Sequence, residues 1–144
     1  MEVGFLQRYG VKLHLICATN GVSISYELTA ANVAEVLLTE ANLPDDLASS
    51  LFGDLHYRSE ALSHALAKCG ISLVAERTEQ HDWRQRIEIA LSSLKQVFGL
   101  GQTLATTLVG LATRIAAKIK TYTYALLINR VLGRPQGHIK ELWT

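Results

Sequence analysis

The sequence has few of the residues that cross-link or anchor a small protein. Its two cysteines, Cys17 and Cys69, form no C-x-x-C pair, so we expect reduced thiols, no disulfide framework and no cysteine metal site. No apolar run reaches the roughly 20 residues of a membrane span. The apolar run at residues 13–18 is too short and badly flanked for a signal peptide. These absences exclude a disulfide-rich secreted protein and a membrane protein, and they favour a cytoplasmic one.

Charge is divided unevenly along the 144 residues, although the net charge is only +1. Residues 1–83 hold 5 Lys and Arg against 11 acids, a balance of −6, whereas residues 84–144 hold 9 against 2, a balance of +7. A basic half favours a polyanionic partner, because Lys and Arg that neutralise phosphates release condensed counterions. Solvated helix faces explain the same charges equally well.

Alternating apolar residues predict a β-hairpin near the start of a single domain. Strands are expected over residues 11–18 and 22–29, because Asn20-Gly21 between two apolar runs is a strong hairpin signal. His14 and Glu27 fall off the apolar faces and are expected to be solvated.

The chain then predicts crossover connections, and thus an α/β sheet. A helix capped by Thr29 or Asn32 should run to about residue 41, and Asp45 and Asp46 after Pro44 are expected to be turn residues. The segments that follow are a strand ending near Asp54, a helix over 57–69 closed by Gly70, and a strand over 71–75.

Asp54 and Glu88 are the two acids whose positions in the sequence favour a catalytic or ligand-binding role. Asp54 ends a buried strand, at the edge where open α/β sheets bind ligands, although it could also cap the helix expected near Tyr57. The helix over 82–98, capped by Asp82, should bury the apolar stripe of Ile87, Leu91, Leu94 and Phe98. A second stripe, with Glu88 at the edge of the buried face, contains Arg84, Glu88, Ser92 and Lys95. Ordinary surface charge pairing is the alternative for this stripe.

Two more helices are predicted, over residues 104–119 and 122–132, followed by a flexible basic tail over 134–144. The first should bury Leu104, Leu108, Leu111 and Ile115, and the second should bury Tyr124, Leu127, Ile128 and Val131.

Four segments together resemble the DDE transposases of bacterial insertion sequences, whose catalytic domain has an RNase H-like fold. They are Y-G-V-K-L-H-L from Tyr9, S-Y-E-L-T-A-A-N-V from Ser25, F-G-D-L-H-Y from Phe52, and the helix bearing Glu88. The resemblance implies an α/β domain over residues 1–133 with an RNase H-like mixed sheet, formed by a β-hairpin and crossover strands, and C-terminal helices. It also implies that Asp54 and Glu88 are the second and third catalytic carboxylates.

The resemblance further implies two Mg²⁺ (or Mn²⁺) ions and a phosphoryl-transfer reaction on double-stranded DNA, at transposon ends and at the target. The expected DNA contacts are Arg84, Lys95, Arg114, Lys118 and Lys120. The implied setting is the bacterial cytoplasm at the nucleoid, with a homo-oligomer left open.

The sequence departs from the family pattern in three places. His81 stands where the family has Tyr, and Leu55-His56 replaces a basic residue and Gly. No Asp precedes Asp45, and Glu2 lies too close to the Tyr9 segment to replace the first catalytic Asp. We therefore expect the first strand to be missing, the sheet to be split, and the chain alone to be inactive.

Two functions remain open. The chain is either part of an active transposase, completed by an upstream frame, or an inactive DNA-binding remnant that interferes with the full enzyme. An Asp-bearing strand encoded just upstream, inside terminal inverted repeats, would favour the first.

Overall fold

The computed structural model describes residues 2–8, 10–32, 50–53, 59–75 and 81–142. The chain divides into two compact units, Met1–Ile87 and Glu88–Thr144, and each is described by itself. We call them the N-terminal and C-terminal units.

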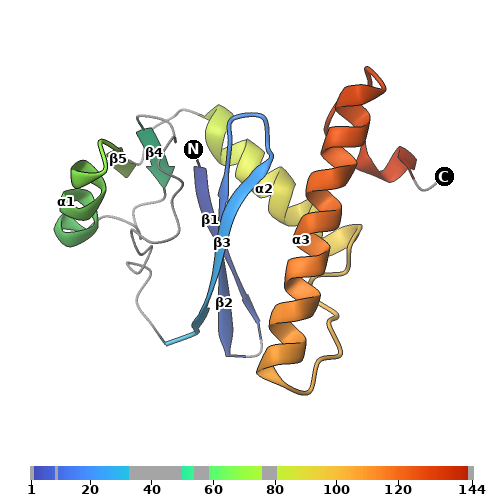
Figure 1. The fold of residues 1–144 in the computed structure, drawn as a ribbon, viewed down its shortest axis with the longest axis horizontal. Helices are drawn as coiled ribbons and strands as arrows, with labels where there is room; N and C mark the ends of the chain where they lie inside the picture. The colour runs from blue at the N-terminus through green and yellow to red at the C-terminus, as the bar shows by residue number, and fades with distance from the viewer. Residues whose placement is uncertain (1, 9, 33–49, 54–58, 76–80, 143–144) are drawn as a thin grey trace. The chain divides into compact units, whose positions relative to one another are not determined.

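One five-stranded mixed sheet dominates the N-terminal unit (Figure 1). Its spatial order is β3-β2-β1-β4-β5. The first three strands are antiparallel, and β4 runs parallel to both β1 and β5. The strands are β1 (Glu2–Arg8), β2 (Val11–Cys17), β3 (Ser23–Ala30), β4 (Ser50–Gly53) and β5 (Ser72–Ala75).

Strand β1 corrects the expectation of a missing first strand and a split sheet. It pairs with β2 along its whole length, from Glu2 opposite Cys17 to Arg8 opposite Val11. On its other side Glu2 pairs with Phe52 of β4. The sequence signal for this strand is Gly10, directly before β2, which has a φ of +75° that favours glycine in tight turns.

The predicted hairpin is confirmed, and its strand limits differ from the prediction by one residue. Gly21 has a φ of +81°, and Asn20 Oδ1 accepts a hydrogen bond from the Val22 amide at 3.1 Å. Thr29 lies in β3 opposite Lys12, so it does not cap a helix. The rest of the helix expected up to residue 41, with Asp45 and Asp46, lies outside the described residues.

Strand β2 is buried on both faces, from Leu13 to Cys17. His14 is only 3% exposed, and its Nε2 lies 2.9 Å from Thr29 Oγ1. Its cross-strand neighbour Glu27 is half-buried. The expectation that these two side chains are solvated is therefore wrong for His14. Alternation of apolar and polar residues predicts one solvent-exposed face, and this inner strand has no such face.

Helix α1 (Glu60–Lys68) connects β4 to the parallel strand β5. Its N-cap is Ser59, whose Oγ accepts a hydrogen bond from the Leu62 amide, so Asp54 is not the cap of this helix. Gly70 follows with a φ of +73°, which confirms the predicted left-handed C-terminal cap.

The C-terminal unit contains one long helix, α3 (Leu108–Val131), where two were predicted. Thr107 caps it through a hydrogen bond from the Gly110 amide, so the expected start at Leu104 is wrong, and Leu104 is 88% exposed. Of the residues predicted to face inward, Ile115 is buried and Leu111 is half-buried. The prediction is wrong for the others, which are exposed: Leu108, Tyr124, Leu127, Ile128 and Val131. The buried stripe is Ile115, Ile119, Tyr122, Ala125, Leu126 and Asn129.

Both sides of α3 are rich in apolar residues, so helical periodicity alone could not identify the buried one. Even so, within the described part of the chain no helix combines the length and apolar character needed to cross a membrane.

Part of the expected flexible tail has regular structure. Residues Ile139–Leu142 form the 3₁₀ helix η3, in which Ile139 is 2% exposed. Asn129 Nδ2 donates to the Gln136 carbonyl at 3.3 Å, which ties this segment to α3. The mobility of residues 134–144 stays a prediction.

Candidate functional site

Helix α2 (His81–Gln96) carries the predicted acid Glu88. It begins one residue before Asp82 and ends before Phe98, so the predicted limits differ by one and two residues. Gly99, with a φ of +58°, follows the helix end, and the Leu100 amide donates a hydrogen bond to the Leu94 carbonyl at 2.9 Å.

The predicted apolar stripe of α2 is partly confirmed. Ile87 and Leu94 are buried, whereas Leu91 and Phe98 are half-buried. Phe98 lies past the helix and packs edge-to-face on Tyr122, with ring centroids 6.3 Å apart. The opposite face of the helix is therefore the one available for function.

Glu88 lies on that exposed face, with Arg84 one turn before it and Lys95 two turns after it. All three residues are exposed, so Glu88 lies further from the core than its expected place at the edge of the buried face. Side chains three or four positions apart on a helix are neighbours, so Arg84 adjoins Glu88, whereas Lys95 lies two turns further along the same face.

Asp54 directly follows Gly53, the last residue of β4. It lies outside the described residues, so the structure places only Glu88 of the predicted pair. Strand β1, which pairs with β4 where the first catalytic acid is expected, contains no Asp, and Glu2 is its only acid.

Two of the predicted DNA contacts have partners within the C-terminal unit. Arg114 donates a hydrogen bond to the Thr103 carbonyl, and Lys118 donates one to the Gly99 carbonyl. Burial, and to a smaller extent the nearby Arg114 charge, lower the pKa of Lys118 below its ordinary value. These two cations hold the loop before α3 in place, whereas Lys120 is exposed.

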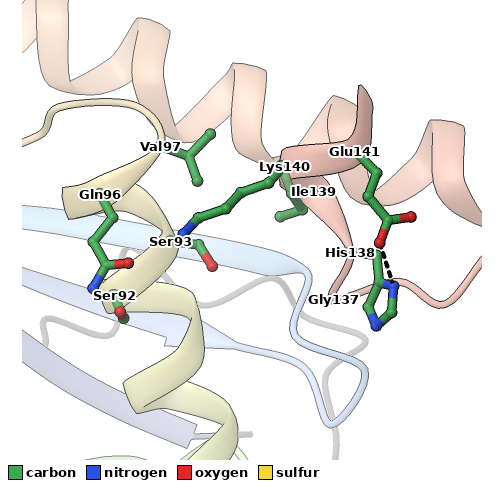
Figure 2. Close-up of a pocket in the computed structure, with 9 residues that line it drawn as sticks. All are labelled: Ser92, Ser93, Gln96, Val97, Gly137, His138, Ile139, Lys140 and Glu141. Atoms are coloured by element: carbon green, nitrogen blue, oxygen red, sulfur yellow. Dashed lines mark ion pairs between the residues drawn. The ribbon is translucent and has the colours of Figure 1, made fainter. Parts of the chain in front are cut away.

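A cavity of about 260 Å³ lies between α2 and η3 within the C-terminal unit, and the sequence did not predict it (Figure 2). Ser92, Ser93 and Gln96 line it from α2, and Lys140 lines it from η3. The only sequence signal was that Ser92 lies on the Glu88 stripe. Lys140 was assigned to the tail, because no local pattern predicts that η3 packs near α2.

Among the described residues, no group of three or more His, Cys, Asp or Glu side chains could hold a metal ion. The exposed Glu88 carboxylate still suits Mg²⁺, since hard cations prefer oxygen ligands.

Comparison with solved structures gives a clear similarity to the catalytic core domain of BIV integrase. The TM-score is 0.59 at 10% identity, and the match covers 84% of this chain and 80% of that one. At this identity the similarity concerns the fold alone, and it confirms the predicted RNase H-like α/β class. A comparison with curated proteins gives no match. The family model described as "Transposase DDE domain" matches residues 3–96, about two thirds of the sequence and the whole stretch from β1 to α2. This chain therefore belongs to the DDE transposase domain family.

Proposed function

We propose that this chain is part of a DDE transposase that acts on double-stranded DNA at the ends of an insertion sequence and, when complete, cleaves and rejoins strands by two-metal phosphoryl transfer. The observation that carries the proposal is the family match from β1 to α2. It covers the strand that precedes Asp54 and the helix that presents Glu88. A bacterial cytoplasmic location at the nucleoid and a homo-oligomer that joins two DNA ends are further parts of the proposal.

In this proposal the second and third catalytic carboxylates are Asp54 and Glu88. Both would hold Mg²⁺ or Mn²⁺, and the bound ions supply positive charge for an in-line displacement at phosphorus. Ser59 caps α1, which leaves Asp54 without that structural role. The exposure of Glu88 beside two cations suits an acid that faces a phosphodiester.

DNA contacts would come from Arg84, Lys95 and Lys120, because their exposed charges can reach backbone phosphates. Arg114 and Lys118, which were predicted for the same role, each donate a hydrogen bond to a loop carbonyl. We assign these two mainly to the stability of the C-terminal unit.

The second candidate function is a DNA-binding protein without strand-transfer activity, which interferes with a complete transposase. The observation that favours it is the content of β1, where Glu2 is the only acid. Two carboxylates hold a pair of metal ions less well than three. We therefore expect the chain alone to bind DNA without cutting it.

The deciding experiment incubates the full chain with Mg²⁺ or Mn²⁺ and duplexes taken from the DNA that flanks its gene. The parent chain should bind these duplexes and leave them intact on a sequencing gel. Asp54→Asn and Glu88→Gln should bind at least as well as the parent, because each removes a negative charge near the DNA.

Cutting that is abolished by both Asp54→Asn and Glu88→Gln would overturn the second candidate and establish the transposase. Glu2→Gln then tests Glu2 as the first catalytic carboxylate: loss of cutting assigns that role to Glu2, and retained cutting excludes Glu2. Failure of the parent chain to bind any duplex would contradict both candidate functions.

A further inference from the structure

The cavity between α2 and η3 has fixed walls within the C-terminal unit. Ile139, 2% exposed, anchors η3. The Asn129 side chain donates a hydrogen bond to the Gln136 carbonyl, and the His138 amide donates one to the Pro135 carbonyl at 3.1 Å. The cavity volume of about 260 Å³ is slightly smaller than a typical drug-sized site, and it suits a small group such as a phosphate with its ester carbon atoms.

Four of the nine residues that line the cavity present hydrogen-bond donors on their side chains. Lys140 contributes an ammonium group, Ser92 and Ser93 contribute hydroxyls, and Gln96 contributes an amide NH₂. In the part of the chain that the structure describes, none of these four side chains makes a hydrogen bond to the protein. Donors clustered around one cation, without an internal acceptor, fit an anion with several oxygen atoms.

The single acid at the cavity lies at its other end. Glu141 Oε1 is 2.9 Å from His138 Nδ1, and both side chains are more than half exposed. Figure 2 shows this pair away from the serines, with Lys140 extending from η3 toward Ser93. A lone carboxylate bonded to a histidine makes a poor cation site, so the anion belongs at the end with Lys140 and Ser93.

We propose that this cavity binds a backbone phosphate of DNA next to the phosphodiester held near Glu88. Ser92 lies one turn after Glu88 on the same continuous helix, about 6 Å further along its axis. The two positions are therefore close enough for neighbouring phosphates of one DNA strand to reach both. The choice of DNA as the ligand rests on the proposed function. The choice of a phosphate group rests on the cavity alone.

The test follows backbone amides of the ¹⁵N-labelled full chain by NMR, during titration first with inorganic phosphate and then with a short duplex. Both additions should shift the amides of residues 92–96 and 137–141. The double variant Ser92→Ala and Ser93→Ala should lose these shifts while its other amides stay unchanged, because alanine is a good helix former. Ser63→Ala, an exposed serine on α1, is the matched control and should keep them.

Lys140→Gln should weaken duplex binding by about eightfold at 0.1 M salt, as expected for the loss of one phosphate contact. Arg130→Gln removes an equal charge from the exposed side of α3 and should change affinity much less. Lys140→Arg should restore most of the loss.

Each other outcome has a definite meaning. Shifts with inorganic phosphate but not with the duplex would overturn the DNA assignment and point to a free phosphate ligand. Shifts with neither ligand would overturn the site. Duplex binding that shifts other amides, with Lys140→Gln equal to Arg130→Gln, would overturn this inference alone and leave the proposed function standing. Absence of any duplex binding would instead overturn the proposed function.

Discussion

Helices α2 and α3 both carry several cations, but these make different contacts. On α2, Arg84 and Lys95 are exposed on the face of Glu88. On α3, which contains no acid, Arg114 and Lys118 are hydrogen-bonded to carbonyls of the loop between the two helices. The balance of +7 in residues 84–144 therefore overstates the charge that can face a polyanion. Arg114 is itself exposed, so its hydrogen bond to a loop carbonyl, rather than burial, distinguishes it from the cations proposed to bind DNA.

The largest expected effect is a loss of stability when the hydrogen bond between α3 and the loop before it is removed. Arg114→Gln removes a charged donor from the carbonyl of Thr103, a residue only 6% exposed. We expect the free energy of unfolding to fall by about 1–2 kcal/mol, which chemical denaturation would measure.

Arg130→Gln is the matched control for Arg114→Gln, because Arg130 is an exposed arginine of the same helix. It should change stability by less than about 0.5 kcal/mol. If Arg114→Gln leaves stability unchanged but weakens duplex binding, the contrast between α2 and α3 is wrong, and Arg114 belongs with the DNA contacts.

Local patterns predicted the N-terminal unit well. The Asn20-Gly21 turn, the β4-α1-β5 crossover and the Gly70 cap each depend on residues close in sequence. The buried position of His14 could not be predicted, since it depends on β2 being an inner strand. Strand β1 was not predicted, because its main local signal is the single glycine turn at Gly10.

The structure of the C-terminal unit was harder to predict, because it depends more on contacts between residues that are distant in sequence. Arg114 and Lys118 have partners 11 and 19 residues away in a loop without periodicity, so no sequence pattern could assign them. The buried side of α3 includes Asn129 and excludes Leu127. The side of the helix that is buried therefore depends on which segments pack against it, and not on the hydrophobicity of its residues alone. At the candidate site, the predicted helix bearing Glu88 is present, but Glu88 is more exposed than predicted, and the cavity beside it was missed because it requires η3.

A smaller effect is expected in DNA affinity when α2 loses an exposed cation. Lys95→Gln should weaken binding to a short duplex by about eightfold at 0.1 M salt, because one phosphate contact contributes a salt slope of about 0.9. Fluorescence anisotropy at several salt concentrations measures both quantities. Stability should stay within about 0.5 kcal/mol of the parent.

Lys68→Gln is the control for Lys95→Gln, since it removes an exposed lysine from α1, which has no predicted DNA contact. Its salt slope should equal that of the parent chain. Equal slopes for Lys95→Gln and the parent would show that the exposed face of α2 does not touch phosphates.

The smallest expected effect is a pH dependence that belongs to Lys118. Its pKa in the folded chain is lowered below 10.5, mainly by burial and then by Arg114. Between the lowered pKa and 10.5 the unfolded chain binds more protons, so stability rises with pH in that window. Below the window Lys118 is charged in both states, and the full cost of charging it in the folded chain remains. Lys118→Gln removes this titration, so the stability of the parent relative to the variant should increase as the pH rises from neutral towards 10.5. Arg114→Gln should narrow the window, because it removes the repulsion that contributes to the lowered pKa of Lys118. A stability difference that stays flat or falls with pH, measured by denaturation of both proteins across that range, would show that Lys118 is as solvated as the cations of α2.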